Sequence, residues 1–121
     1  MPIATFSLVA LDCPDPLALA EFYQQITGGE IDTENLSSGW VQLHPPTGSD
    51  IAFQLDAGHE PPDWPVGTPQ QMHIDFDVAD LDEGEAQLLA IGARKAAVQP
   101  SPDSWRVYLD PAGHPLCLVK A

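Results

Sequence analysis

Basic residues are scarce in this sequence. The 121 residues include 4 Lys and Arg against 18 Asp and Glu, which gives a formal net charge of −14 at pH 7 with histidine neutral. A surface of that sign repels nucleic-acid phosphates and anionic membrane surfaces. We therefore expect neither nucleic acid nor a membrane as a partner, and interpret the charge as a solvated surface that keeps the protein soluble.

Long apolar runs are also missing. No run approaches the ~18 residues that a membrane span requires, and the first residues, Met-Pro-Ile-Ala-Thr-Phe, lack the basic and apolar regions of a signal peptide. With 44% hydrophobic and 18% charged residues, the composition is typical of one globular domain. The sequence predicts a single cytoplasmic domain, residues 1–121.

Cysteine is rare too. Cys13 and Cys117 are the two cysteines, too far apart for a C-x-x-C motif and too few for a disulfide framework. We expect reduced thiols, as in a cytoplasm, and a bond between them remains open if the fold brings them together.

The most informative feature that is present is an internal repeat. At a constant offset of 65 residues, the landmarks Leu8, Asp15, Trp40 and Gly48 recur as His73, Asp80, Trp105 and Gly113. Such repetition indicates two copies of one structural module. We predict module one at about 4–56, a linker at about 57–69 pinned by Trp64, and module two at about 70–121, with the function where the modules meet.

Hydrophobic periodicity predicts the same order, β-α-β-β-β, in both modules. Asp15-Pro16 predicts a helix start and Gly28-Gly29 its end. Asp80 is expected to cap the second helix, which ends before Gly92. In module one, this places a helix at about 16–27 and strands at 6–12, 30–33, 39–44 and 51–55. In module two, strands are expected at 73–78, 96–99, 105–109 and 116–119.

Several motifs together resemble a known family. They are the span from Asp15-Pro16 to Phe22-Tyr23, the Gly28-Gly29 stop, the strand Met72-His73-Ile74-Asp75, and the closing turn Leu109-Asp110-Pro111-Ala112-Gly113-His114 followed by Leu116-Cys117-Leu118-Val119. Over nearly its whole length the chain resembles the vicinal oxygen chelate superfamily of glyoxalases, bleomycin resistance proteins and dioxygenases, and its short glyoxalase-like members in particular. The resemblance implies an α+β fold whose modules form curled mixed sheets around a shared cleft, and a twofold homodimer.

The resemblance also identifies metal positions. Metal-dependent members hold a divalent ion with four residues, and motif matching places Leu8, about Gln54, His73 and about Cys117 there. Of these, His73 conforms clearly, because Leu8 has no lone pair, Gln54 offers a neutral carbonyl oxygen and Cys117 a soft thiolate. We therefore expect a degenerate site and no cofactor. The alternative is a divalent metal held by His73, Gln54 and Cys117.

Without a metal, the candidate catalytic residues are His73 and Asp75, which share one strand face. His73 is alternatively a hydrogen-bonded strand histidine or a ligand-binding residue. The other side chains also have plain structural readings: Cys117 as a core residue, Trp105 as a structural peg, and Arg106 as a surface charge if it is not a clamp for an anionic ligand. The candidate ligand-binding residues are Gln54, His73, Trp105, Arg106, Tyr108 and Cys117.

Two classes of function remain open. The first is a protein that binds a small organic molecule in the cleft between the modules, which the degenerate metal positions favour. The second is an enzyme, either a metal-dependent lyase, isomerase or dioxygenase, or a metal-free acid/base catalyst that uses His73 and Asp75.

Overall fold

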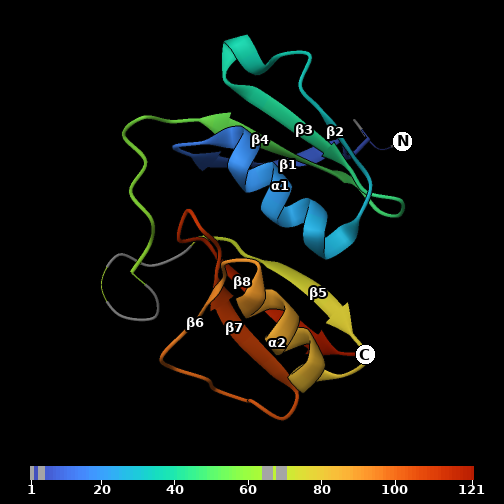
Figure 1. Cartoon of the computed structure of the whole chain (residues 1–121), viewed down its shortest axis with the longest axis vertical. Coiled ribbons are helices and arrows are strands. Elements are labelled where there is room, and N and C mark those ends of the chain that lie inside the picture. Colours follow the sequence, from blue (N-terminus) through green and yellow to red (C-terminus); the bar gives the residue numbers. More distant parts are fainter. Residues whose placement is uncertain (1, 3–4, 64–66, 68–70) are drawn as a thin grey trace. The chain divides into compact units, whose positions relative to one another are not determined.

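The computed structural model describes residues 2, 5–63, 67 and 71–121. It divides into two compact units, Met1–His59 and Glu60–Ala121, and each contains one four-stranded mixed sheet and one longer helix (Figure 1). The predicted α+β class with two repeated modules is confirmed. Part of the predicted linker, including Trp64, lies outside the described residues.

The first unit follows the order predicted for module one. Its elements are β1 (Leu8–Cys13), α1 (Pro16–Thr27), β2 (Glu30–Asp32), a short 3-10 turn η1 (Leu36–Ser38), β3 (Trp40–His44) and β4 (Asp50–Leu55). The sheet has the order β1-β4-β3-β2, in which β1 runs parallel to β4 and the other pairs are antiparallel. The turn η1 is the one element here that periodicity did not predict.

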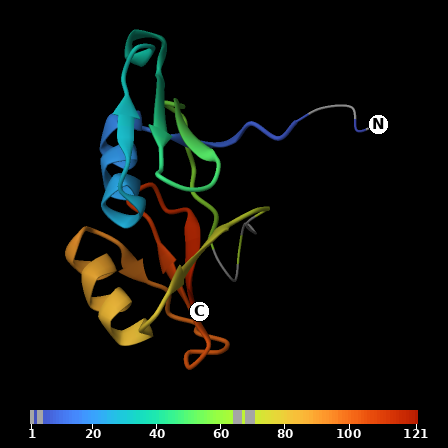
Figure 2. The same ribbon diagram turned by 90° about the vertical axis from the view of Figure 1, so that its right-hand side faces the viewer.

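Local chemistry fixes the bounds of α1. The Asp15 carboxylate accepts a hydrogen bond from the Ala18 backbone N–H at 3.1 Å, and the helix ends where Gly28 takes a positive φ of 73°. On the side facing the sheet, the Tyr23 ring stacks on Phe53 of β4 with ring centroids 5.6 Å apart. Each helix lies on one side of its own sheet (Figure 2).

The second unit repeats this plan. Its elements are β5 (Ile74–Val78), α2 (Leu81–Ala90), β6 (Arg94–Lys95), β7 (Trp105–Leu109) and β8 (Pro115–Lys120), with the sheet order β5-β8-β7-β6. Asp80 caps α2 by accepting from the Glu83 N–H at 3.0 Å, as Asp15 does for α1. The related residues Gly48 and Gly113 both adopt positive φ, 85° and 89°, which glycine tolerates without the steric cost other residues incur.

One predicted strand is wrong. The expected strand at 96–99 is replaced by β6 two residues earlier, because the Gln99 side chain takes the place of a strand backbone. Its amide nitrogen donates to the Val107 carbonyl at 2.7 Å, and its amide oxygen accepts from the Val107 N–H at 2.9 Å. The Gln99 side chain therefore makes hydrogen bonds to the Val107 backbone of β7 that a longer β6 would otherwise have made.

No helix among the described residues combines the length and apolar character that a membrane crossing needs. Cys13 and Cys117 are both buried, and neither forms a disulfide in the structure.

Candidate functional site

The strand register of the second unit sorts its side chains onto two faces. Asp75 of β5 pairs with Cys117 of β8, which in turn pairs with Val107 of β7. Directly paired residues point to the same face of a sheet, and residues two apart on a strand share that face. His73, just before β5, therefore joins Asp75 and Cys117 on the face opposite α2.

A pocket of about 410 Å³ opens on this face. Among the described residues, those that line it belong to the second unit: His73, Asp75, Trp105, Val107, Pro115, Cys117 and Val119. The lining is mostly apolar, and its polar groups come from neighbouring positions on β5 and β8. A largely apolar cavity with a few converging polar groups is the usual form of a small-molecule site.

His73 and Asp75 supply the main polar side chains of this pocket. The imidazole Nε2 lies 3.3 Å from Asp75 Oδ1, and the two side chains are 41% and 56% exposed. The carboxylate can orient the ring, but at this exposure water screens the pair. The sequence predicted that the two residues share a face, and the structure brings their polar atoms within reach of each other.

Cys117 is the buried member of the site, with 6% of its surface exposed. Burial raises the pKa of its thiol to about 11, and the neighbouring Asp75 carboxylate adds to the shift by repelling a thiolate and accepting the thiol hydrogen. Without a cation nearby, Cys117 is therefore a protonated thiol at neutral pH and a poor nucleophile.

Together, these residues form a cluster of possible metal ligands. One ligand atom each from His73, Asp75 and Cys117 can be chosen so that all three lie within 4.8 Å of one another. His73 and Cys117 were predicted as metal positions, whereas Asp75 was predicted only as an acid/base residue. The signal for Asp75 was its spacing from His73, because two residues along a strand is the closest same-face position.

Gln54 lies on β4 in the first unit, where it pairs with Trp40 and Asp12 and is exposed. Trp40 is held by a hydrogen bond from its indole N–H to Gln42 Oε1 at 3.2 Å. Its repeat-related partner Trp105 instead lines the pocket. The two indoles therefore have different surroundings, although their positions in the repeat are equivalent.

The structure does not bring Arg106 and Tyr108 to this pocket. They occupy the α2 side of β7, and the Arg106 guanidinium lies 2.9 Å from Asp82 and 3.5 Å from Glu85. The Tyr108 hydroxyl donates to Glu85 at 2.9 Å. Strand alternation turns these two side chains toward the helix, so their ligand-binding role stays a prediction that this pocket does not support.

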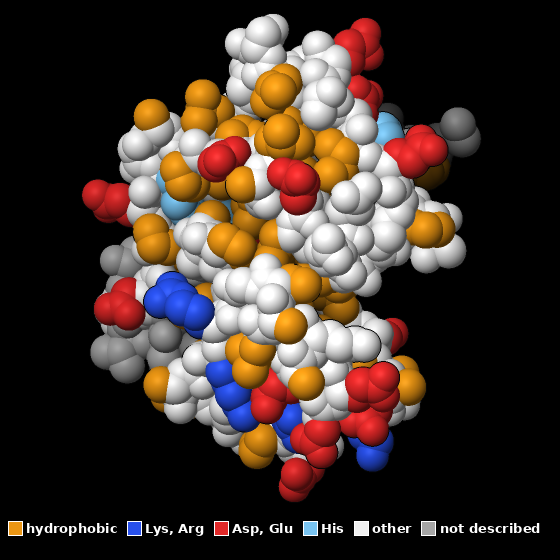
Figure 3. Space-filling model, viewed as in Figure 1, with side chains coloured by type: hydrophobic (Ala, Val, Ile, Leu, Met, Phe, Trp, Pro, Cys, Tyr) orange, Lys and Arg blue, Asp and Glu red, His pale blue; other side chains and the backbone are white. Residues whose placement is uncertain are grey.

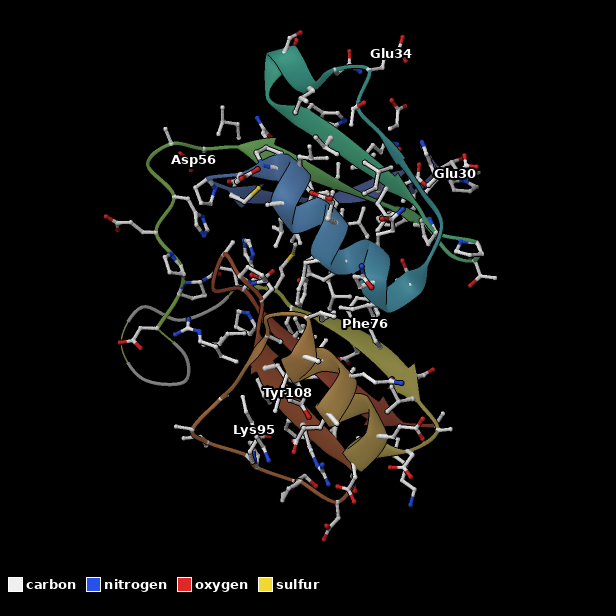
Figure 4. The ribbon with its side chains drawn as sticks, in the orientation of Figure 1. Glu30, Glu34, Asp56, Phe76, Lys95 and Tyr108 are labelled. Carbon is white, nitrogen blue, oxygen red and sulfur yellow. The ribbon has the colours of Figure 1, made fainter. Side chains whose placement is uncertain are left out.

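Lys95 completes that network, with its ammonium 2.9 Å from Glu85. The hydrogen bond from Lys95 is the largest cause that lowers the pKa of Glu85, and burial is the largest cause that raises the pKa of Tyr108. Figure 4 shows Lys95 and Tyr108 in the second unit, Tyr108 beside α2. All basic residues of the chain, Arg94, Lys95, Arg106 and Lys120, belong to this unit (Figure 3).

Comparison with known proteins places this geometry in context. A family model described as a glyoxalase-like domain matches residues 8–119. No curated protein matches the chain. Among solved structures, a glyoxalase/bleomycin resistance protein/dioxygenase family enzyme from Burkholderia phytofirmans has a TM-score of 0.69 at 22% identity, covering 95% of this chain and 97% of that one.

Two further structures have the same fold. A genomically encoded fosfomycin resistance protein from Listeria monocytogenes has a TM-score of 0.72 at 16% identity, covering 100% of this chain and 93% of its own. A glyoxalase family protein from Enterococcus faecalis has a TM-score of 0.66 at 21% identity, with coverage of 97% and 98%. At these identities the similarity establishes the fold alone.

Proposed function

Because this chain belongs to the glyoxalase-like domain family of the vicinal oxygen chelate superfamily, we propose that it binds a small organic molecule in the pocket of its second unit. The observation that carries the proposal is the pocket itself, about 410 Å³ in volume with an apolar lining and the His73 and Asp75 polar groups. That volume falls within the range of ligand sites, ~300–1,000 Å³.

The lining restricts the chemistry of the ligand. Trp105, Val107 and Val119 offer an indole and aliphatic surface to a ring or a hydrocarbon segment. His73 supplies a donor or an acceptor, whereas the Asp75 carboxylate accepts hydrogen bonds and repels anions. The ligand class that fits is a neutral or cationic, partly apolar molecule that presents a hydroxyl or amine to Asp75.

The metal positions implied by the family do not fit this chain. Leu8 has no lone pair, and Gln54 is exposed on β4 with a neutral amide. The thiol at Cys117 is a soft donor where hard oxygen is expected. The proposed binding therefore relies on no ion held by that set of four residues.

The test is a binding screen with a matched pair of tryptophan variants. Native mass spectrometry of the full chain against neutral, cationic and anionic fragments should give neutral or cationic hits. Trp105→Ala should weaken these hits at least ~10-fold, the scale of a lost aromatic contact. Trp40→Ala, the repeat-related change in the first unit, should leave them unchanged. Equal binding by the Trp105 variant and the wild type would contradict the proposal.

A second candidate function is metal-free acid/base catalysis. It is favoured by the His73 imidazole lying 3.3 Å from the Asp75 carboxylate, because a carboxylate orients and supports a histidine that transfers protons. If a bound molecule is converted, the rate of the wild type should depend on pH, and His73→Gln should lose one limb of that profile. An identical profile in the variant would exclude this role.

A further inference from the structure

We propose that the second unit by itself holds a divalent metal ion through a mixed nitrogen, oxygen and sulfur set, His73, Asp75 and Cys117. This differs from the four positions that the family resemblance implies, because it recruits Asp75 and needs neither Leu8 nor Gln54. The inference goes beyond the proposed function, since it concerns the binding of an ion and not of an organic molecule.

The three side chains converge on one point of the sheet face. Ligand atoms of the three side chains all lie within 4.8 Å of one another. Zinc bonds of ~2.0 Å to nitrogen and oxygen and ~2.3 Å to sulfur place tetrahedral ligands roughly 3.3–3.6 Å apart. The His73 and Asp75 atoms are already at 3.3 Å, so closing the remaining separations requires side-chain movements of only about 1 Å.

Two of the three side chains stand on paired strands. Asp75 and Cys117 are directly paired residues on the neighbouring parallel strands β5 and β8, so the sheet's hydrogen bonds hold their backbones at a fixed separation. His73 precedes β5 and is one same-face step from Asp75. A site positioned by adjacent strands is more precise than one carried on loops.

The three donor groups suit a zinc-like ion. Imidazole, carboxylate and thiolate are all zinc ligands, and a thiolate selects borderline or soft ions over Mg²⁺ or Ca²⁺. One carboxylate and one thiolate neutralise a divalent ion, so the buried sulfur would no longer be an uncompensated charge. The neighbouring Trp105, Val107 and Val119 supply no ligand atoms, which leaves the fourth position to water or to a pocket ligand.

The experiment uses Co²⁺ as a spectroscopic substitute for Zn²⁺. The full chain, stripped with chelator and kept reduced, should bind one equivalent of Co²⁺ and show a thiolate-to-cobalt charge-transfer band. Cys117→Ser should abolish that band and weaken binding at least ~10-fold. His73→Gln and Asp75→Asn should weaken binding by a similar factor but keep the band, because the thiolate remains.

The chain supplies its own control in Cys13, the other buried cysteine, whose thiol donates to the Gln54 backbone carbonyl at 3.7 Å. Cys13→Ser preserves a donor there and should leave the cobalt spectrum unchanged, with circular dichroism to verify folding of every variant. Absence of Co²⁺ binding by the folded wild type, or unchanged binding by Cys117→Ser or Asp75→Asn, would overturn the proposal. Fragment binding by the metal-free chain is measured separately, so the proposed function and this inference fail independently.

Discussion

On β7, neighbouring residues have opposite tasks. Trp105 and Val107 line the pocket, whereas Arg106 and Tyr108 point to the carboxylates of α2. The alternation of side chains along a strand separates the two sets completely. A charged or hydroxyl-bearing side chain of β7 that faces α2 therefore stabilises the fold and does not line the pocket.

The scaffold role of Tyr108 can be measured. Tyr108 is fully buried, and its hydroxyl donates to Glu85 at 2.9 Å. Tyr108→Phe keeps the ring and removes that charge-assisted bond, so it should lower the free energy of unfolding by about 1–3 kcal/mol. Urea denaturation measures the loss. Fragment and Co²⁺ binding should be unaffected. A loss of either in the folded variant would indicate that Tyr108 contributes to binding after all.

The hydrogen bonds of Asp50 lead us to expect that the stability of the fold depends on pH. Its carboxylate accepts from Gln42 Nε2 at 2.8 Å and lies 2.7 Å from His44 Nδ1. The Gln42 hydrogen bond is the largest cause of its lowered pKa, and His44 lowers it further. A carboxyl group with a lowered folded-state pKa stabilises the fold above its unfolded pKa of ~3.9, and this contribution is lost as the pH falls through the folded value.

Wild-type stability should therefore decline below about pH 4, and Asp50→Asn should remove part of that decline. Thermal melts at a series of pH values measure it. Gln42→Ala should resemble Asp50→Asn in the slope, because it removes the main cause of the shift. Parallel melting curves for the wild type and Asp50→Asn across this range would contradict the assignment.

At the scale of elements, the Gln99 side chain joins the segment between β6 and β7 to the sheet. Gln99 makes three hydrogen bonds through its amide, two with the Val107 backbone and one to the Ala96 carbonyl at 3.0 Å. Ala96 in turn donates its own N–H to the Val107 carbonyl. The amide of Gln99 thus continues the pairing of the sheet beyond the end of β6.

Removal of that amide should loosen this edge of the sheet. Gln99→Ala removes the acceptor of the part-buried Val107 N–H and one of the two donors to the Val107 carbonyl, which keeps the Ala96 N–H. The loss should cost about 1–3 kcal/mol in unfolding free energy. Chemical denaturation measures the cost, and hydrogen exchange should show faster exchange at the Val107 amide. Gln87→Ala, an exposed change within α2, is the matched control and should stay within ~0.5 kcal/mol of the wild type.

The whole molecule carries a prediction about assembly. Phe6 and Met72 each come shortly before the first strand of a unit, and they are 68% and 71% exposed. β1 and β5 are edge strands of their sheets. Apolar side chains next to edge strands are typical of surfaces that another chain covers. On these grounds we propose a twofold homodimer.

Light scattering at micromolar concentration should then give about twice the 13.0 kDa mass of one chain. Met72→Asp and Phe6→Asp should shift the equilibrium toward monomer. Leu36→Asp changes another exposed hydrophobic residue, in η1, and should not. A wild-type mass near that of a single chain would refute the proposal.

Much of the fold was determined by the sequence itself. The bounds of α1 and β7 agree with the prediction, because caps, glycine stops and strand alternation act within a few residues of the chain. The repeat placed Asp15 and Asp80 at the same structural position before any contact was known. The family followed from the same local motifs.

Only the tertiary structure decided what these elements hold together. The displacement of β6 depends on Gln99 reaching Val107, and the ligand cluster depends on the β5 and β8 register that aligns Asp75 with Cys117. The retention of Arg106 at α2 depends on Asp82 and Glu85. Each of these is a contact between residues on different segments of the chain, and residue order and periodicity carry no information about such distances until the strands are paired.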